Sequence, residues 1–172
     1  NFDSLHSAIH GMGWMHRGLK PGTYCVLRQN GSIWMSDTAM ERNTCRPALA
    51  DAKGDVLLAG LGIGMVAVAL CQKPEVSSVT VLELSPEVIA LVAPNVAHPK
   101  LTIIQADAYQ PPFKGRIFDY VWLDIWADIC SDNWGTMKPL LRKYRSFLRP
   151  GGRADAWLKD WCQEESKRDG MY

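Results

Sequence analysis

Three glycines at alternate positions, Gly60, Gly62 and Gly64, follow directly on the apolar run at residues 56–59. Glycine has no Cβ atom, so such a loop lets the backbone turn sharply and lets a ligand approach closely. A helix that packs tightly on a sheet requires the same residues. The loop therefore predicts either a binding feature or close helix packing, and both interpretations stay open.

Acidic residues stand at the ends of the other apolar runs. Glu83, Asp107 and Asp124 each follow one of these runs directly or within a few residues. Each of them could cap a helix, but a ligand with hydroxyl, amino or ammonium groups would also need such acceptors. Asp124 is the candidate for chemistry, because a carboxylate beside Trp126 could bind an ammonium group and remove its proton.

The elements that must position these residues read as strands alternating with helices. Apolar runs without polar alternation are typical of parallel strands that are buried on both faces. The expected strands cover residues 56–59, 79–82, 101–104, 117–123 and 153–158, and the expected helices cover 65–70, 86–92 and 133–148. This alternation predicts an α/β fold with a Rossmann-like, doubly wound parallel sheet, in which ligands bind at the carboxyl ends of the strands.

The first fifty residues differ in pattern from the rest. Two short runs rich in β-branched and aromatic residues flank Asn30 and Gly31, which predicts a small β-hairpin at roughly residues 23–36. A helical segment follows, and its N-cap is expected to be Asp37 or Thr38.

The composition is that of an ordinary globular chain. It has 172 residues, of which 47% are hydrophobic and 22% are charged, enough for a sizeable core. The net charge of +1 gives no electrostatic reason to expect nucleic acid or an anionic membrane as a partner, and no apolar run is long enough to span a bilayer. We expect a hairpin-and-helix extension over residues 1–50 and a ligand-binding domain over residues 51–172.

Neither the cysteines nor the histidines indicate a metal site. The five cysteines are scattered without CxxC spacing, which argues against a zinc site or a disulfide framework and favours a reducing cytoplasm. His6, His10 and His16 could imitate a metal cluster, but an N-terminal helix explains them better. No metal is therefore assigned.

Taken together, the motifs resemble the class I S-adenosylmethionine-dependent methyltransferase superfamily, and within it the spermidine synthase-like branch. Five segments carry the resemblance in the family's order over roughly residues 51–158: LLAGLGIGM, VTVLELSPEVI, LTIIQADAY, FDYVWLDIW and LRPGG. The preceding hairpin is similar to the β-rich lead-in of spermidine synthases. The resemblance implies S-adenosylmethionine, or its decarboxylated form, as cofactor and a small-molecule acceptor as partner.

The resemblance also implies roles for particular residues. Glu83 would accept the ribose hydroxyls, Asp107 would accept from the adenine amino group, and Asp124 and Trp126 would act in catalysis. The implied cofactor-binding residues are Gly60, Gly62, Gly64, Met65, Glu83, Leu84, Asp107, Ala108 and Asp124.

The sequence departs from the family patterns at two positions. Many methyltransferases have an acid where this chain has Leu58, and spermidine synthases usually have an aspartate where it has Ile63. A cationic amine in a partly buried site still needs a carboxylate or several acceptors. Asp37, Glu41 and Asp124 are therefore the candidates for recognising the ligand's amino group.

Three functions remain open. The favoured one is a transferase for a small-molecule acceptor, with methyl transfer before spermidine synthase-like aminopropyl transfer. The second is a catalytically inactive module that binds the cofactor. The third, a nicotinamide-linked oxidoreductase, is less favoured because Met65 stands where the dinucleotide fingerprint requires a small residue.

Two further expectations concern the last strands of the sheet and the partners of the chain. Only a polar tail follows the LRPGG segment, so the last strands of the family fold are expected to be missing. An exposed edge strand favours pairing with another chain, which predicts a homodimer. Nucleic acid is not expected as a partner, because the loop after Leu123 lacks the motifs of base methyltransferases.

Overall fold

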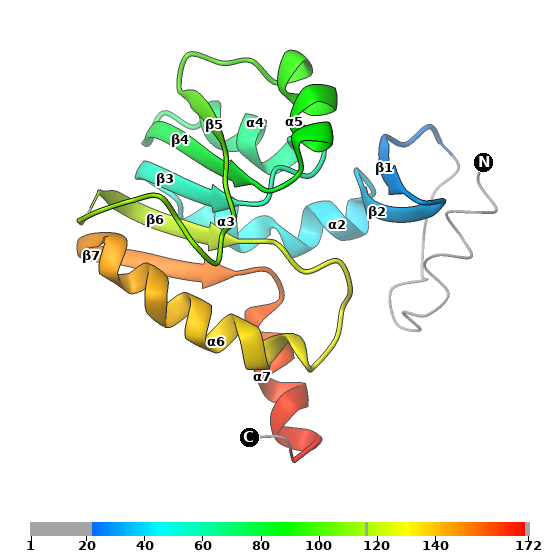
Figure 1. Ribbon diagram of the computed structural model, residues 1–172, viewed down its shortest axis with the longest axis vertical. Helices are drawn as coiled ribbons and strands as arrows, with labels where there is room; N and C mark the ends of the chain where they lie inside the picture. The colour runs from blue at the N-terminus through cyan, green and yellow to red at the C-terminus, as the bar shows by residue number, and fades with distance from the viewer. Residues whose placement is uncertain (1–21, 116, 171–172) are drawn as a thin grey trace.

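The computed structural model describes residues 22–115 and 117–170, and its centre is a five-stranded parallel sheet (Figure 1). The strands follow the spatial order β5-β4-β3-β6-β7. Their bounds are Gly54–Ala59 for β3, Val76–Glu83 for β4, Leu101–Gln105 for β5, Phe118–Leu123 for β6 and Leu148–Ala156 for β7. The three N-terminal histidines considered for a metal site lie outside the described residues.

The sheet is doubly wound about β3. The chain adds β4 and β5 on one side of β3 and then returns to add β6 and β7 on the other side, always in parallel pairing. The predicted α/β fold with a Rossmann-like parallel sheet is therefore confirmed. Since the order reverses between β3 and β6, the loops that follow these two strands diverge and leave a crevice between them.

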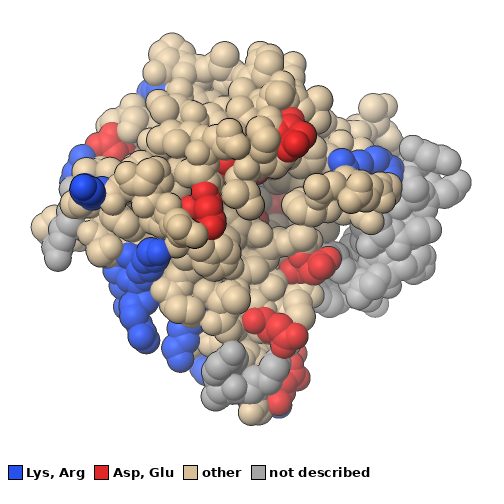
Figure 2. Space-filling view, in the orientation of Figure 1, with Lys and Arg blue, Asp and Glu red and all other residues tan. Residues whose placement is uncertain are grey.

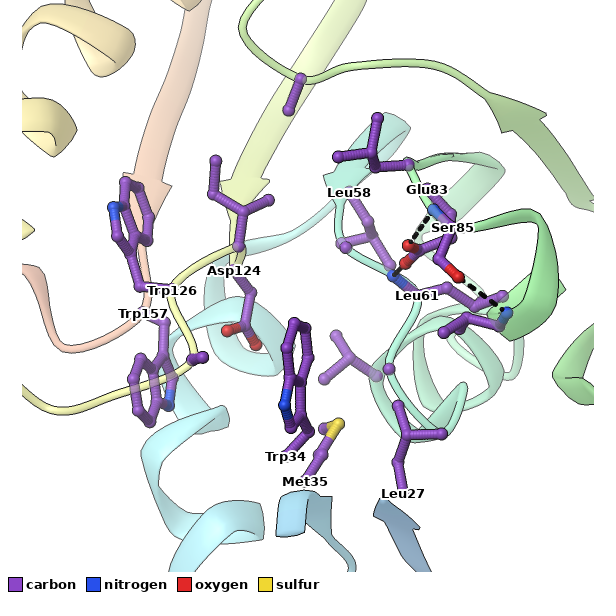
Figure 3. A pocket seen from close by; sticks show the side chains of 18 of the residues that line it. Leu27, Trp34, Met35, Leu58, Leu61, Glu83, Ser85, Asp124, Trp126 and Trp157 are labelled. Carbon is purple, nitrogen blue, oxygen red and sulfur yellow. Dashed lines mark hydrogen bonds between the residues drawn. The ribbon is translucent and has the colours of Figure 1, made fainter. Parts of the chain in front are cut away.

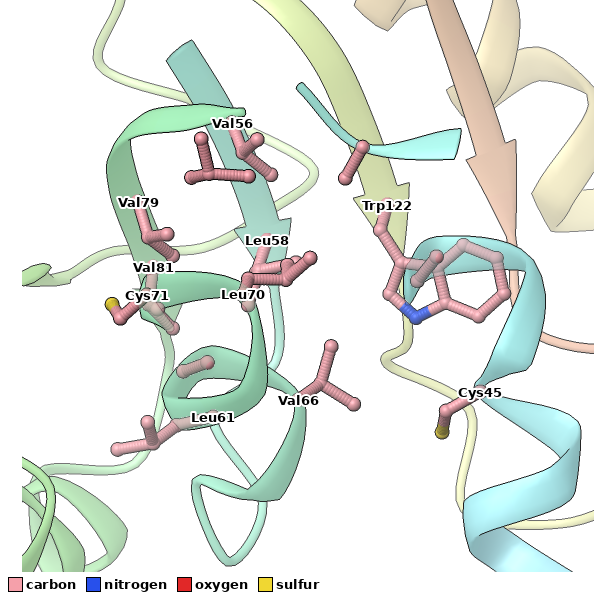
Figure 4. Packing of buried hydrophobic residues seen from close by; sticks show 14 of the residues in the cluster. Cys45, Val56, Leu58, Leu61, Val66, Leu70, Cys71, Val79, Val81 and Trp122 are labelled. Atoms are coloured by element: carbon pink, nitrogen blue, oxygen red, sulfur yellow. The ribbon is translucent and has the colours of Figure 1, made fainter. Parts of the chain in front are cut away.

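Helices cover both faces of the sheet. They are α4 (Met65–Cys71), α5 (Pro86–Val92), α6 (Asn133–Tyr144) and α7 (Lys159–Arg168). Alternate residues of β3 enter two cores: Val56 and Leu58 pack with α4 and Trp122 (Figure 4), whereas Leu57 and Ala59 pack on the side of α6. Burial on both faces explains why these strands show no polar alternation.

The predicted hairpin is confirmed. It consists of β1 (Val26–Gln29) and β2 (Ser32–Ser36), which pair antiparallel. The turn residues Asn30 and Gly31 have φ angles of 51° and 83°, and a two-residue turn that matches the twist of the strands requires positive φ at both positions. Figure 1 places this hairpin on the side to which the strands of the central sheet point.

The helical segment after the hairpin is split into α2 (Ala39–Thr44) and α3 (Arg46–Asp51). Pro47 in the first turn of α3 has no backbone N–H to donate, so one helix cannot run through this point. Thr38 is the N-cap of α2, as one of the two alternatives predicted, although its side chain makes no capping hydrogen bond.

Three boundaries and one element near the C-terminus were predicted wrongly, and one of these boundaries is the end of the last strand, which lies at Ala156 instead of residue 158. The helix expected over residues 133–148 ends at Tyr144, and a 3₁₀ turn at Arg145–Phe147 leads into β7, which begins at Leu148 rather than at residue 153. Leu148 is buried against the core beside α6 and pairs with Phe118, which draws it into the sheet. The polar tail expected there forms α7, because this segment buries Cys162 and Ser166.

Within the described residues the sheet ends at β5 on one side and at β7 on the other. The homodimer and the division at residue 50 stay predictions. In this part of the chain no helix is long and apolar enough to cross a membrane, and no group of three or more potential metal ligands is found.

Candidate cofactor and acceptor site

A cavity of about 770 Å³ opens between the carboxyl ends of the central strands and the N-terminal hairpin. In Figure 2 it appears as a hollow between the main body of the molecule and the hairpin. Figure 3 shows Leu27, Trp34 and Met35 of the hairpin on one side and Glu83 at the end of β4 on another. The hairpin is therefore a wall of the site as well as a lead-in to the domain.

The structure brings most of the predicted site residues to this cavity. Those that line it are Gly60, Gly62, Glu83, Leu84, Asp107, Ala108, Asp124 and Trp126. Gly64 and Met65 are not among the lining residues. Met65 begins α4 and packs against the core on that side of the sheet.

The glycine loop is required by the packing of the protein on itself. Gly60, Gly62 and Gly64 have φ angles of 99°, 51° and 79°, which other residues rarely adopt. A Cβ atom on Gly60 would lie 2.1 Å from the carbonyl oxygen of Asp124, and one on Gly62 would lie 2.2 Å from Sδ of Met35. A Cβ atom on Gly64 would lie 2.5 Å from Cγ1 of Val96, which follows α5 in the chain. Close packing thus explains all three glycines, and two of them also line the cavity.

We expect Gly60→Ala to lower the free energy of unfolding more than Gly151→Ala does. Both positions have positive φ, so both variants share a backbone cost of about 1–2 kcal/mol. At Gly151 no atom lies within 4 Å of the added Cβ, whereas at Gly60 it meets a backbone oxygen, which adds about 1–3 kcal/mol. Urea denaturation measures the difference, and equal losses would show that the loop shifts without cost.

Glu83 ties the glycine loop to the start of α5. Its Oε2 accepts a hydrogen bond from the backbone N–H of Leu61 and its Oε1 accepts one from that of Ser85, both at 2.9 Å. Ser85 in turn caps α5 by accepting from the N–H of Val88. Each carboxylate oxygen has a second lone pair, so Glu83 can hold the loop and still accept from a ligand.

The Asp107 loop is fixed by bonds to its own backbone and to α6. Oδ1 of Asp107 accepts from the backbone N–H of Tyr109 at 2.7 Å. The Tyr144 hydroxyl donates to the carbonyl oxygen of Ala108 at 2.8 Å, and Lys143 donates to that of Tyr109. No hydrogen bond within the described residues uses the Oδ2 atom of Asp107, which leaves it available to a ligand.

The Asp124 carboxylate points into the cavity, as Figure 3 shows, and none of the hydrogen bonds found in the described chain engages it. Desolvation by burial raises its pKa to about 7, and the negative charge of Glu41 adds to the shift. The Trp122 indole N–H lowers the pKa of Asp124 and so opposes part of this shift, although it makes no hydrogen bond of normal geometry. A carboxyl with a pKa near 7 is suited to take up and release protons at neutral pH.

Of the other acids considered for the ligand's amino group, the structure places Glu41 in the cavity wall and Asp37 outside it. Oε1 of Glu41 accepts from the backbone N–H and the hydroxyl of Ser36, both at 2.8 Å. Burial raises the pKa of Glu41, and the bonds from Ser36 oppose this shift. Oδ1 of Asp37 accepts instead from the backbone N–H of Cys25.

Trp126 is held by α6, and a different tryptophan is exposed in the cavity. Nε1 of Trp126 donates to the Thr136 hydroxyl at 2.9 Å, and its ring packs against the core beside α6. Trp34 on β2 is 52% exposed and lines the cavity. The pattern of the sequence holds no signal for Trp34 or Met35 as site residues, because it does not show where the hairpin packs.

Comparisons with known proteins agree with this fold. The sequence matches a family described as methyltransferase domain over residues 56–152, while no curated protein matches the chain. A chain of the complex between the Haloferax volcanii Trm112 methyltransferase activator and a methyltransferase has a TM-score of 0.55, at 22% identity, over 68% of this chain and 53% of that one.

Two further solved structures are similar. The CcbJ methyltransferase from Streptomyces caelestis has a TM-score of 0.51, at 23% identity, over 67% of this chain and 47% of that one. DhpI, solved as a SAM–HEP complex, has a TM-score of 0.50, at 23% identity, over 69% of this chain and 55% of that one. The chain thus spans about half the length of these proteins, and the likeness shows the fold. Because the family match covers more than half of the chain, from β3 into β7, the chain belongs to the methyltransferase domain family.

Proposed function

We propose that this chain is an S-adenosylmethionine-dependent methyltransferase domain that acts on a small-molecule acceptor. The observation that carries the proposal is the charge of the cavity at the switch point of the sheet. Of the residues that the structure describes, one arginine, Arg28, lines the cavity, together with six acids: Glu41, Glu83, Glu87, Asp107, Asp124 and Asp128. Such a lining favours a ligand of net positive charge.

S-adenosylmethionine fits this lining, because its sulfonium gives it a net positive charge. When bound, it supplies a methyl group: the acceptor forms a bond to the methyl carbon while the carbon–sulfur bond breaks and its electron pair stays on sulfur. Glu83 is proposed to accept from the ribose and Asp107 from the adenine, with Leu84 and Ala108 beside them. The SAM complex of DhpI, a protein of the same fold, supports this choice of cofactor.

The chain's own residues then position the acceptor. Gly60 lets the backbone of the loop pack against the Asp124 carbonyl, so the proposed cofactor-binding loop lies directly beside the proposed base. Asp124 is proposed as the group that removes a proton from the acceptor, and Trp126 as the residue that positions the Asp124 loop through Thr136. Gly64 and Met65 are left out of the proposed contacts, because they do not line the cavity.

Aminopropyl transfer from decarboxylated S-adenosylmethionine is the alternative reaction that the sequence suggests. It would require the paired aspartates of the spermidine synthase-like branch, which are three residues apart, whereas Asp124 and Asp128 are four apart. The similar structures named above give no support to that branch. The methyltransferase proposal is therefore preferred, with the cytoplasm as its compartment on the basis of the scattered cysteines.

Glu83→Ala is expected to weaken the binding of S-adenosylhomocysteine by roughly tenfold to a hundredfold. The substitution removes a charge-assisted acceptor, worth about 1.5–3 kcal/mol, and also the tie to Leu61. Isothermal titration calorimetry gives the dissociation constants. Glu75→Ala, in the turn before β4 and outside the cavity, is the control that should bind as the original chain does. Unchanged binding by a folded Glu83→Ala variant would limit Glu83 to its structural role.

A further inference from the structure

Two carboxylates reach the cavity from segments far apart in the chain. Glu41 comes from α2 and Asp124 from the loop after β6. Among the interactions found within residues 22–115 and 117–170, the Asp124 carboxylate makes no hydrogen bond of normal geometry, and the Glu41 carboxylate uses only Oε1. No ion pair in that part of the chain involves either residue. The arginine in the cavity wall, Arg28, donates to the carbonyl oxygen of Gly31.

The two carboxylates are close enough to repel each other. The charge of Glu41 contributes to the raised pKa of Asp124, and both charges contribute to the raised pKa of the Cys45 thiol, which lies between α2 and α3. Negative charges that share a poorly solvated wall are unfavourable unless a cation neutralises them. A ligand cation would relieve this repulsion, which gives the site a reason to bind one.

Tryptophans complete this end of the cavity. The Trp122 side chain is 1% exposed and lines the cavity, and its Nε1 makes no hydrogen bond of normal geometry to any described residue. An unpartnered buried donor points to a ligand or a carboxylate that moves within reach when a ligand binds. In Figure 3 the Asp124 carboxylate points to the side of the cavity on which Trp34 and Trp157 also lie. The faces of indole rings attract alkylammonium groups.

We propose that Glu41, Asp124 and Trp34 form a subsite for an alkylammonium group. The ammonium group can belong either to an amine acceptor or to the amino-acid end of the cofactor. If it belongs to an amine acceptor, the chain is an N-methyltransferase. This assignment as an N-methyltransferase rests on the proposed function, whereas the ammonium subsite does not. With an amine acceptor, one ammonium N–H bond breaks, the proton passes to the Asp124 carboxylate, and the electron pair stays on nitrogen as the nucleophile.

Calorimetry with two pairs of probes tests the subsite. The first pair is phenethylamine and its neutral analogue 2-phenylethanol, chosen because apolar side chains including Trp34 and Leu84 are exposed around the cavity. The second pair is S-adenosylhomocysteine and 5′-methylthioadenosine, which lacks the amino-acid end. The proteins are the original chain, Glu41→Gln, Asp124→Asn and the control Asp37→Asn, whose carboxylate lies outside the cavity wall.

For an amine acceptor, phenethylamine should bind at least about tenfold more tightly than 2-phenylethanol, and Glu41→Gln and Asp124→Asn should each remove most of this preference. If the ammonium group belongs to the cofactor, the same variants should bind S-adenosylhomocysteine about tenfold more weakly and should bind 5′-methylthioadenosine as tightly as the original chain does. Asp37→Asn should behave as the original chain in both series.

Folded variants that bind all four probes as the original chain does would overturn the subsite. Failure of the original chain to bind either nucleoside would instead refute the proposed function, and the amine pair would still decide on the subsite. Gln at position 41 keeps an oxygen for Ser36, so the start of α2 is preserved in this comparison.

Discussion

Asp124→Asn is expected to reduce methyl transfer to an amine by roughly a hundredfold to ten-thousandfold, the usual contribution of a positioned base. Asparagine has nearly the same shape as aspartate but cannot take up the proton that the ammonium must lose. Binding of 5′-methylthioadenosine should change by less than about threefold, because Asp124 is proposed to face the transferred group rather than the nucleoside. The measurement is the rate at which S-adenosylhomocysteine forms over a panel of amines.

The pH dependence of the same reaction adds a second readout. With a pKa raised to about 7, Asp124 is protonated at lower pH and cannot act as a base, so activity should fall as the pH drops through 7. Asp132→Asn, at the exposed N-cap of α6, is the control that keeps both the rate and the profile. Equal turnover by Asp124→Asn would rule out Asp124 as the base, whereas no turnover by the original chain over the whole panel would favour a catalytically inactive binding module.

Asp124→Asn is also expected to stabilise the protein at pH 8 by up to a few kcal/mol, and this gain should vanish toward pH 4. The ordinary pKa of 3.8 is raised to about 7 in the folded chain. Between these values the folded state keeps the proton and the unfolded state releases it. The stability that the neutral carboxyl allows is therefore complete at low pH and is lost as the pH rises through 7.

Urea denaturation of the original chain and the variant, at several pH values from 4 to 8, measures this effect. Only the difference between the two proteins is used, because titrating groups that do not interact with Asp124 cancel in it. The difference for Asp132→Asn should stay flat with pH. A pH-independent difference for Asp124→Asn would mean that cavity water solvates the carboxylate and that its pKa is ordinary.

The sequence by itself determined the sheet, the hairpin and the positions of the acids at the strand ends. These features are encoded locally: apolar runs without alternation specify buried parallel strands, and Asn30 with Gly31 specifies the turn. The helix predicted over residues 86–92 has the bounds found for α5, because Ser85 supplies a cap and Pro86 fits the first turn.

Tertiary structure alone decided which residues share the cavity. Glu41 and Asp124 line the same cavity because α2 and the loop after β6 both border it, and no spacing in the sequence encodes this arrangement. Met35 accepts a hydrogen bond from the backbone N–H of Ile63 in the glycine loop, so part of the steric demand at Gly62 comes from the hairpin.

The same holds for the end of the chain and for the aromatic residues of the site. The polar composition of residues 159–168 hid a helix, because only two of its side chains are buried and their burial depends on contact with the rest of the fold. Trp126 is two residues after Asp124 in sequence, but its indole N–H donates to Thr136 of α6, whereas Trp34 comes from the distant hairpin into the cavity. Local patterns specify secondary structure, but side-chain neighbours across a site are set by long-range packing, which depends on the whole fold at once.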